Sequence, residues 1–158
     1  MSQKPSVLFV CLGNICRSPL AEAAFRARAE EAGLDVETDS VGTAGYHIGE
    51  PPDLRSIAEA ANHGIDISGY RGRQLSADDY TRFTHILALD HSNLADIRER
   101  APANSTAKIA LLLDQVPTRK GSAVDDPYHD GADMFALTWK LVDEAAKALV
   151  AELRDGSD

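Results

Sequence analysis

Short apolar runs alternate with longer amphipathic stretches along the chain. Residues 7–10 form a continuous apolar run, as expected for a parallel strand that is buried on both faces. Further strands are predicted over residues 36–41, 85–89 and 108–113. Because helical or long connecting segments separate these strands, the pattern predicts an α/β fold. We expect a doubly wound, four-stranded parallel sheet with helices on both faces.

The segments between the strands contain residues that favour the starts and ends of helices. Ser18 as N-cap and Pro19 in the first turn open the first helix, and Gly33 ends it. Asp53 is suited to cap the next helix. The last helix carries one apolar stripe with spacings of three and four: Phe135, Trp139, Val142, Ala146, Leu149 and Leu153. This stripe predicts a helix that packs on the sheet rather than a cofactor or partner site.

Composition and charge narrow the class of protein. The chain has 158 residues, 44% of them hydrophobic, and this length fits a single domain, 1–158. Its formal net charge of −9 argues against a nucleic-acid partner and against docking on an anionic membrane. No apolar run approaches the roughly 18 residues of a spanning helix, and the N-terminus lacks the layout of a signal peptide. We therefore expect a cytoplasmic protein, with a monomer as the expected state in solution.

The cysteine content argues against a disulfide framework or a metal site. The two cysteines are Cys11 and Cys16, which indicates a reducing compartment. A four-ligand zinc cluster would need more than these two thiols and five histidines scattered along the sequence can offer. Neither a metal nor another cofactor is expected.

The loop after the first strand carries the strongest chemical pattern. Ligands of such folds bind beyond the carboxyl ends of the strands, where the sequence CLGNICRSP, residues 11–19, is located. Cys11 and Arg17 are separated by five residues, a spacing that can wrap one tetrahedral anion in inward-facing backbone N–H groups. Gly13 permits a backbone turn that other residues resist. The predicted phosphate-binding residues are Leu12, Gly13, Asn14, Ile15, Cys16, Arg17 and Ser18.

The same loop predicts a nucleophile. The start of a helix and a neighbouring guanidinium favour the thiolate form of Cys11, which would lie beneath the bound phosphate. The hydroxyl group of Ser18 can donate to that sulfur and later assist its departure. Asp126 precedes Pro127 in the long loop that follows the fourth strand, and we expect it to be the general acid and then the general base. A thiolate and a protonated carboxyl group predict a bell-shaped pH profile with a mildly acidic optimum.

Four motifs, in order along nearly the whole chain, resemble the low-molecular-weight protein tyrosine phosphatases. They are residues 11–19, residues 42–50 (GTAGYHIGE) with Asp53 and Arg55, residues 87–93 (LALDHSN) and residues 126–128 (DPY). The resemblance implies a two-step phosphoryl transfer through a phosphocysteine, without metal, from a tyrosine-phosphorylated protein. It also implies that Cys11 is the nucleophile, that Arg17 binds the phosphoryl group and that Asp126 is the acid.

The resemblance further assigns supporting residues. Asn14, Ser18 and Asp90 would hold the loop and its arginine in shape. Ile15, Tyr46 and Tyr128 would line the crevice for the aryl ring, with Tyr46 where many members carry Trp. Tyr70 stands near the position of a His that contacts the loop serine in many members. Cys16 matches a second loop cysteine that can form a reversible disulfide with Cys11.

Simpler interpretations of several of these residues remain open at this point. Cys16 is equally explained as a small buried hydrophobe, and Asp53 as a helix cap. Asp90 could merely close the third strand, and Tyr128 could be an exposed loop aromatic.

Three other functions compete with a tyrosine phosphatase. An arsenate reductase on the same fold would use the same loop, but the thioredoxin-coupled type needs further cysteines and none follows Cys16; a type that uses an external thiol stays open. A protein-arginine phosphatase is distinguished by a threonine at the position of Ile15. A silent phosphotyrosine-binding module would lack Cys11 or Asp126, and both are present.

Overall fold

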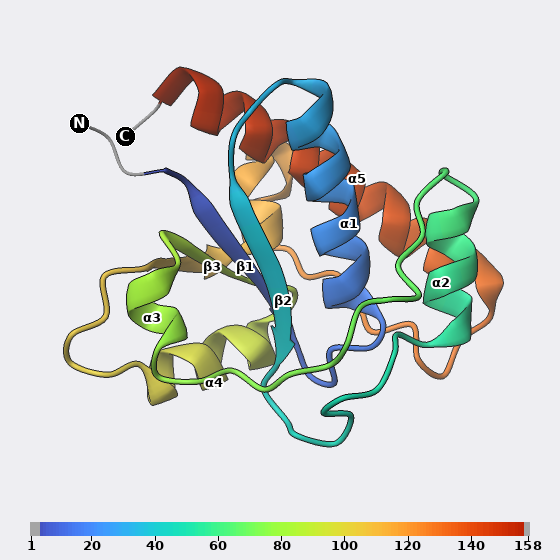
Figure 1. Ribbon diagram of the computed structural model, residues 1–158, viewed down its shortest axis with the longest axis horizontal. Helices are drawn as coiled ribbons and strands as arrows, with labels where there is room; N and C mark the ends of the chain where they lie inside the picture. The colour runs from blue at the N-terminus through green and yellow to red at the C-terminus, as the bar shows by residue number, and fades with distance from the viewer. Residues whose placement is uncertain (1–3, 157–158) are drawn as a thin grey trace.

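The computed structural model describes residues 4–156 and contains one parallel sheet. The first three and last two residues, which the predicted domain 1–158 includes, lie outside the described part. The sheet has the strand order β2-β1-β3-β4 (Figure 1). Its strands are β1 (Ser6–Cys11), β2 (Glu37–Gly42), β3 (His85–Ala88) and β4 (Lys108–Leu111). The predicted four-stranded parallel sheet is confirmed.

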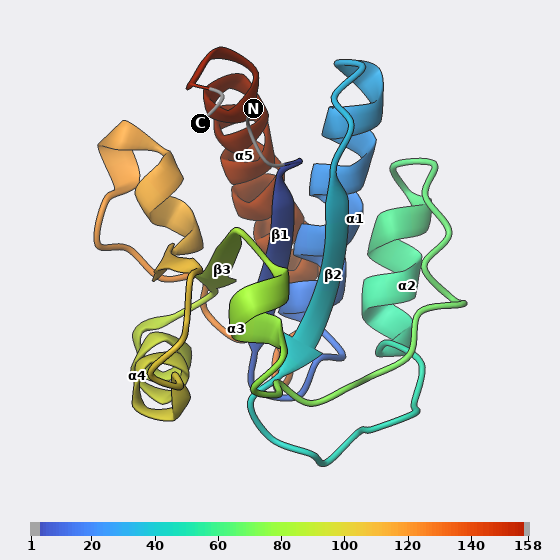
Figure 2. The same cartoon turned by 60° about the vertical axis from the view of Figure 1, so that its left-hand side comes forward.

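Helices cover both faces of the sheet, as Figure 2 shows. Those of the described residues are α1 (Arg17–Glu31), α2 (Leu54–Ala61), α3 (Asp79–Arg82), α4 (His91–Arg100) and α5 (Ala132–Gly156). Helices α1, α2 and α5 pack against one another on one face, while α3 and α4 lie on the other. Within residues 4–156, none of the helices is both long and apolar enough to cross a membrane.

Strand β1 contributes side chains to two hydrophobic cores, because successive side chains of a strand point to opposite faces of the sheet. Val7 and Phe9 belong to the core formed with α1 and α5, whereas Leu8 and Val10 belong to the core formed with α3 and α4. All four side chains are at most 1% exposed. Burial on both faces explains why this strand reads as an unbroken apolar run.

The predicted last strand is too long. Residues 108–111 form β4, but the apolar run continues into a 3-10 helix, Leu112–Gln115, and a second one follows at Pro117–Arg119. Leu112 and Leu113 remain buried in the core. An apolar run indicates that a segment is buried, and a buried segment can be either a strand or a 3-10 helix.

The start of α1 also differs from the prediction. The helix begins at Arg17, with Cys16 as the N-cap residue and no hydrogen bond from a capping side chain. Ser18 is therefore not the cap but the second helical residue. The cap predicted at Asp53 is confirmed, because its carboxylate accepts the N–H of Arg55 at 2.8 Å. The end predicted at Gly33 is confirmed, because this residue has a φ of +68° and directly follows Ala32, the C-cap residue of α1.

Candidate active site

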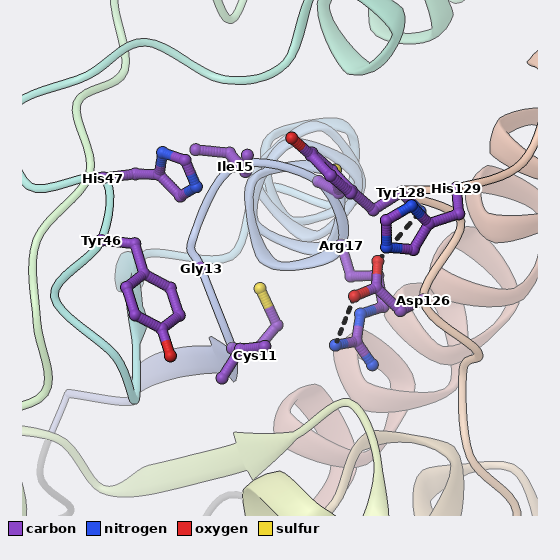
Figure 3. Close-up of a pocket in the computed structure, with 11 residues that line it drawn as sticks. Cys11, Gly13, Ile15, Arg17, Tyr46, His47, Asp126, Tyr128 and His129 are labelled. Carbon is purple, nitrogen blue, oxygen red and sulfur yellow. Dashed lines mark hydrogen bonds and ion pairs between the residues drawn. The ribbon is translucent and has the colours of Figure 1, made fainter.

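A pocket of about 260 Å³ opens at the carboxyl end of β1. Its walls come from three segments that are distant in sequence: Cys11, Leu12, Gly13, Ile15, Cys16, Arg17, Tyr46, His47, Asp126, Tyr128 and His129. In Figure 3 the sulfur of Cys11 points into the hollow, with Tyr46 and His47 on one side and Asp126 and His129 on the other. The fold thus brings the sequence-predicted nucleophile, acid and crevice residues to one place.

Residues 12–16 form the loop that connects β1 to α1. Its unusual backbone lies at Asn14, which has a φ of +59°, and not at Gly13, where the sequence suggested it. Gly13 serves close approach instead, because a Cβ there would come within 3.2 Å of the His47 ring. Asn14 tolerates the left-handed conformation better than most residues, and its amide is held by hydrogen bonds to three partners.

Neighbouring segments hold the carbonyl groups of the loop. The N–H groups of Thr43 and Ala44 donate to the carbonyls of Cys11 and Leu12 at 2.9 and 3.0 Å. The N–H of Asp53 donates to the carbonyl of Ile15 at 2.8 Å. With these carbonyls held by other segments, the arrangement agrees with a loop whose N–H groups turn toward an anion.

The Cys11 sulfur has a hydroxyl group as its neighbour. Ser18 Oγ lies 3.0 Å from Cys11 Sγ and accepts a hydrogen bond of 2.8 Å from Asn14 Nδ2. All three side chains are at most 4% exposed. As the predicted helix cap, Ser18 would accept a hydrogen bond from the backbone of its own helix. In the structure its hydroxyl group faces the Cys11 sulfur instead.

Arg17 is buried and is held from two sides. Its Nη1 donates to Asp90 Oδ2 at 2.6 Å and to the carbonyl of Val124 at 3.0 Å. Burial works against its charge, but the Cys11 sulfur, Asp90 and Asp126 together raise the pKa of the guanidinium above its ordinary value. Among the described residues its buried Nε has no hydrogen-bond partner, which leaves that donor for an oxyanion in the pocket.

Asp126 stands at the rim beside the arginine. Its Oδ2 lies 3.7 Å from Arg17 Nη2, and its Oδ1 accepts the N–H of Tyr128 at 3.1 Å (Figure 3). The carboxyl group is 43% exposed, so water and a leaving group can both reach it. These contacts bring the Asp-Pro-Tyr segment to the loop that carries Cys11.

Arg55 ties the acid-bearing segment to α2. Its guanidinium pairs with Asp53 through two nitrogens at 2.9 Å and donates to the carbonyl of Asp130 at 2.8 Å. It also lies over the rings of Phe135 and Tyr128, at 4.6 and 5.6 Å from their centres. Arg55 holds the pKa of the Asp53 carboxyl below its ordinary value. Asp53 is therefore a helix cap that also orients this arginine.

Cys16 is the last residue of the loop, and its side chain is buried. It packs with Ile15 and Phe135 in a small buried cluster, and Phe135 is the first residue of the α5 stripe. Burial, followed by the nearby Asp53 carboxylate, raises the pKa of Cys16 to about 12. Its surroundings are those of a small hydrophobe in its thiol form, and a disulfide with Cys11 stays a prediction.

Two tyrosines differ in what the structure shows of them. Tyr46 is 72% exposed and lines the pocket. Tyr70, which the resemblance places near the position of a His that contacts the loop serine, faces Arg26 and Glu22. Burial, followed by the Glu22 carboxylate, raises the pKa of its hydroxyl group. The hydroxyl group of Ser18 has Cys11, Asn14 and Val41 as its neighbours.

Sequence reasoning missed two histidines of the pocket. His47 lies within the second motif and has its Nδ1 3.0 Å from Glu50 Oε1, and His129 follows Tyr128. Their spacing gave no signal, since only the fold brings them together. Across the described chain, no group of three or more His, Cys, Asp or Glu side chains is arranged to hold a metal ion.

The chain is similar to known proteins in both sequence and structure. Residues 6–157 match the family model described as low molecular weight phosphotyrosine protein phosphatase. A low molecular weight protein-tyrosine-phosphatase of Streptomyces coelicolor is 43% identical over 94% of this chain and 93% of its own length. The crystal structure of YfkJ from Bacillus subtilis superposes with a TM-score of 0.90 at 37% identity, covering 99% of this chain and 98% of that one.

A more distant neighbour is named for another substrate. A variant of the arginine phosphatase YwlE, whose active-site serine is phosphorylated, has a TM-score of 0.86 at 25% identity. The match covers 95% of this chain and 96% of that one.

Proposed function

The chain belongs to the low molecular weight phosphotyrosine protein phosphatase family, and we propose that it hydrolyses phosphotyrosine in proteins, and small aryl phosphates, through a phosphocysteine. One observation carries this proposal: the Cys11 sulfur points into a pocket that Arg17 and Asp126 border. The three groups supply what a two-step phosphoryl transfer needs, namely a nucleophile, an anion-binding fork and a proton carrier.

In the first step, Cys11 Sγ attacks phosphorus. The S–P bond forms while the P–O bond to the tyrosine breaks, and Asp126 gives its proton to the departing phenolate oxygen. Arg17 and the loop N–H groups hold the other phosphate oxygens, aided by the positive end of α1. Exposure of the Asp126 carboxyl group at the rim supports its access to the leaving group.

In the second step, water attacks the phosphocysteine. Asp126 accepts a proton from the water, the new O–P bond forms, and the S–P bond breaks to release the Cys11 thiolate. The 3.0 Å contact with Ser18 Oγ supports a hydroxyl group that stabilises this thiolate as it departs. The phosphorylated active-site serine of the YwlE variant supports a phosphoenzyme on this fold. Since every group belongs to the chain, the route requires neither a metal nor a cofactor.

The rim favours an aromatic substrate. Ile15, Tyr46 and Tyr128 line the pocket and form an apolar crevice into which an aryl ring would fit. An arginine phosphatase is less favoured because the apolar Ile15 stands where a threonine distinguishes those enzymes. Arsenate reduction with an external thiol remains the second alternative.

Replacement of the nucleophile and the acid tests the mechanism. Cys11→Ser should abolish turnover of p-nitrophenyl phosphate while retaining phosphate binding, because the loop and Arg17 remain. Asp126→Ala should slow phenyl phosphate more than p-nitrophenyl phosphate, since the better leaving group needs less protonation. The neighbouring, exposed Asp125 provides the control Asp125→Ala. Near wild-type turnover by Cys11→Ser, or an equal loss on both esters in Asp126→Ala, would count against these assignments.

Substrate profiling tests the specificity. Phosphotyrosine peptides should be hydrolysed faster than phosphoserine or phosphoarginine peptides of the same sequence. Preference for phosphoarginine, or thiol-dependent arsenate reduction faster than aryl phosphate hydrolysis, would favour the alternatives.

A further inference from the structure

A line of hydrogen bonds leads from the nucleophile to a buried carboxylate on α1. Beyond the contact between Cys11 and Ser18, Asn14 Nδ2 donates to Ser40 Oγ at 3.0 Å as well as to Ser18 Oγ at 2.8 Å. Ser40 Oγ in turn donates to Glu22 Oε1 at 2.8 Å. All five side chains are at most 5% exposed. They come from β1, the loop, α1 and β2, so the line crosses the layers of the fold.

The chemistry of the groups sets the direction of each bond. The amide nitrogen of Asn14 can only donate, so the oxygen of Ser40 accepts from it. Ser40 then directs its single hydroxyl proton to Glu22 Oε1, which as a carboxylate oxygen can only accept. At the other end, Ser18 Oγ accepts from Asn14 and keeps its own proton for Cys11 Sγ or for the Val41 carbonyl, 3.5 Å away.

Only a carboxylate satisfies both neighbours of Glu22. Its Oε2 accepts a hydrogen bond from Arg26 Nη2, and its Oε1 accepts the hydroxyl proton of Ser40. A glutamine would present one oxygen and one NH₂ group, so either Arg26 or the hydroxyl proton of Ser40 would lose its acceptor. Burial raises the pKa of Glu22, whereas Arg26 and Ser40 oppose that rise. Burial of a charged carboxylate is energetically unfavourable, and the hydrogen bonds from Arg26 and Ser40 offset this cost.

The middle of this line is also the point of backbone strain. Asn14 keeps its φ of +59° while its amide donates to Ser18 and Ser40 and accepts the N–H of Arg73 at 3.0 Å. Loss of the Ser40 partner would remove one of the three bonds that hold the amide and let it rotate more widely. A rotated amide would no longer present its N–H to Ser18.

We propose that Glu22 is a positioning residue for the nucleophile: through Ser40 it fixes the Asn14 amide, so that the Ser18 hydroxyl group is presented to the Cys11 sulfur. The inference rests on the proposed role of Cys11 as the nucleophile. Glu22 touches neither the substrate nor the reacting atoms, and it acts through the three side chains between.

Two variants of the line and two controls test this role. Ser40→Ala and Glu22→Gln each remove one bond, Ser40→Thr retains the hydroxyl group, and Glu30→Gln makes the same charge change at an exposed position of α1. For each variant we would measure kcat and KM for p-nitrophenyl phosphate, and the rate of Cys11 alkylation by iodoacetamide against pH. The charged and titratable groups that surround the two ends are Arg17, Cys16 and Asp126 for Cys11, and Arg26, Asp39 and Tyr70 for Glu22.

The sign of the alkylation shift distinguishes positioning from simple charge. Glu22→Gln removes a negative charge, which by Coulomb's law alone favours the thiolate and moves the alkylation midpoint to lower pH. The proposal predicts the opposite, a midpoint at higher pH, because Ser18 no longer donates steadily. Ser40→Ala, which changes no charge, should give the same upward shift and lower kcat by about three- to tenfold, the net effect of one hydrogen bond. Ser40→Thr and Glu30→Gln should behave like the wild type.

Two results would contradict the proposed role of Glu22. A downward or absent shift in Glu22→Gln would overturn the proposal. So would a Ser40→Ala protein with a lower melting temperature but unchanged kcat and midpoint, because the line would then only tie α1 to the sheet. If Glu22→Gln fails to fold, Ser40→Ala still decides the matter. Failure of the proposed function is a separate result, recognised by an active Cys11→Ser variant.

Discussion

Asp90 joins two parts of the molecule, and its replacement separates them. Its Oδ2 accepts a hydrogen bond of 2.6 Å from Arg17 Nη1, while its Oδ1 accepts the N–H of Asn93 at 2.7 Å and caps α4. In Asp90→Asn, the amide oxygen can still cap the helix, but the NH₂ group then meets the N–H of Arg17. In Asp90→Ala, both contacts are lost.

The contacts set the expected magnitudes. Loss of an N-cap costs about 1 kcal/mol of the free energy of unfolding. Removal of one partner of a buried ion pair costs roughly 3–5 kcal/mol. Here that figure falls to about 2 kcal/mol, because Asp90 is 25% exposed and Arg17 keeps the Val124 carbonyl. We therefore expect losses of about 2 kcal/mol in Asp90→Asn and about 3 kcal/mol in Asp90→Ala.

The effect on activity follows from the orientation of Arg17. If about 2 kcal/mol of orientation is lost from the transition state, kcat/KM falls roughly thirtyfold in both variants. The assay pairs urea unfolding with kcat/KM for p-nitrophenyl phosphate and the affinity for inorganic phosphate. Glu99→Gln makes the same charge change at an exposed position of α4 and serves as the control. An Asp90→Asn protein with lower stability but unchanged kcat/KM and phosphate affinity would refute the orienting role.

Three further predictions concern the surroundings of the loop. Phe135→Ala should lower the free energy of unfolding by about 3–5 kcal/mol in urea titrations, and reduce kcat, because Phe135 is 1% exposed and packs against the loop. Mass spectrometry after brief iodoacetamide treatment at pH 7 should find Cys11 modified before Cys16, since burial raises the pKa of Cys16 to about 12; for the same reason, a peroxide-induced disulfide between them should form slowly. Arg55 lowers the pKa of Asp53, so its stabilising effect is present above about pH 4 and is lost as the pH falls; in Asp53→Asn, acid unfolding curves should show less of this loss while the α2 cap remains.

The sheet and the position of the loop were predictable because each follows from a local pattern. The run at residues 7–10 is apolar throughout since β1 lies between two strands and is covered on both faces. The loop follows directly from the rule that ligands bind at the carboxyl ends of parallel strands. The end of β4 was not predictable in this way, because Leu112 and Leu113 are as buried in their 3-10 helix as they would be in a strand.

The inner part of the site depends on tertiary contacts that no spacing reveals. Ser18 has the residue type of a helix cap, and only the position of Cys11 and Asn14 shows where its hydroxyl group turns. Gly13 was the obvious candidate for the strained backbone, yet Asn14 takes it because Ser40 and the N–H of Arg73 hold its amide. These partners lie more than 20 residues away in the sequence.

The burial of the site separates chemistry from recognition. Cys11 and Arg17 are each 2% exposed and are held by groups from several segments, so with the proposed mechanism a change there should alter how the phosphate is bound and attacked. Tyr46 and Tyr128 are 72% and 42% exposed, and the hydrogen bonds that hold Asn14 and Arg17 involve neither side chain. Changes at the rim should therefore alter KM and the choice among aryl phosphates, whereas changes along the line from Cys11 to Glu22 should alter kcat. Evolution of new specificity on this fold can proceed at the rim without disturbing the buried polar contacts that prepare the sulfur.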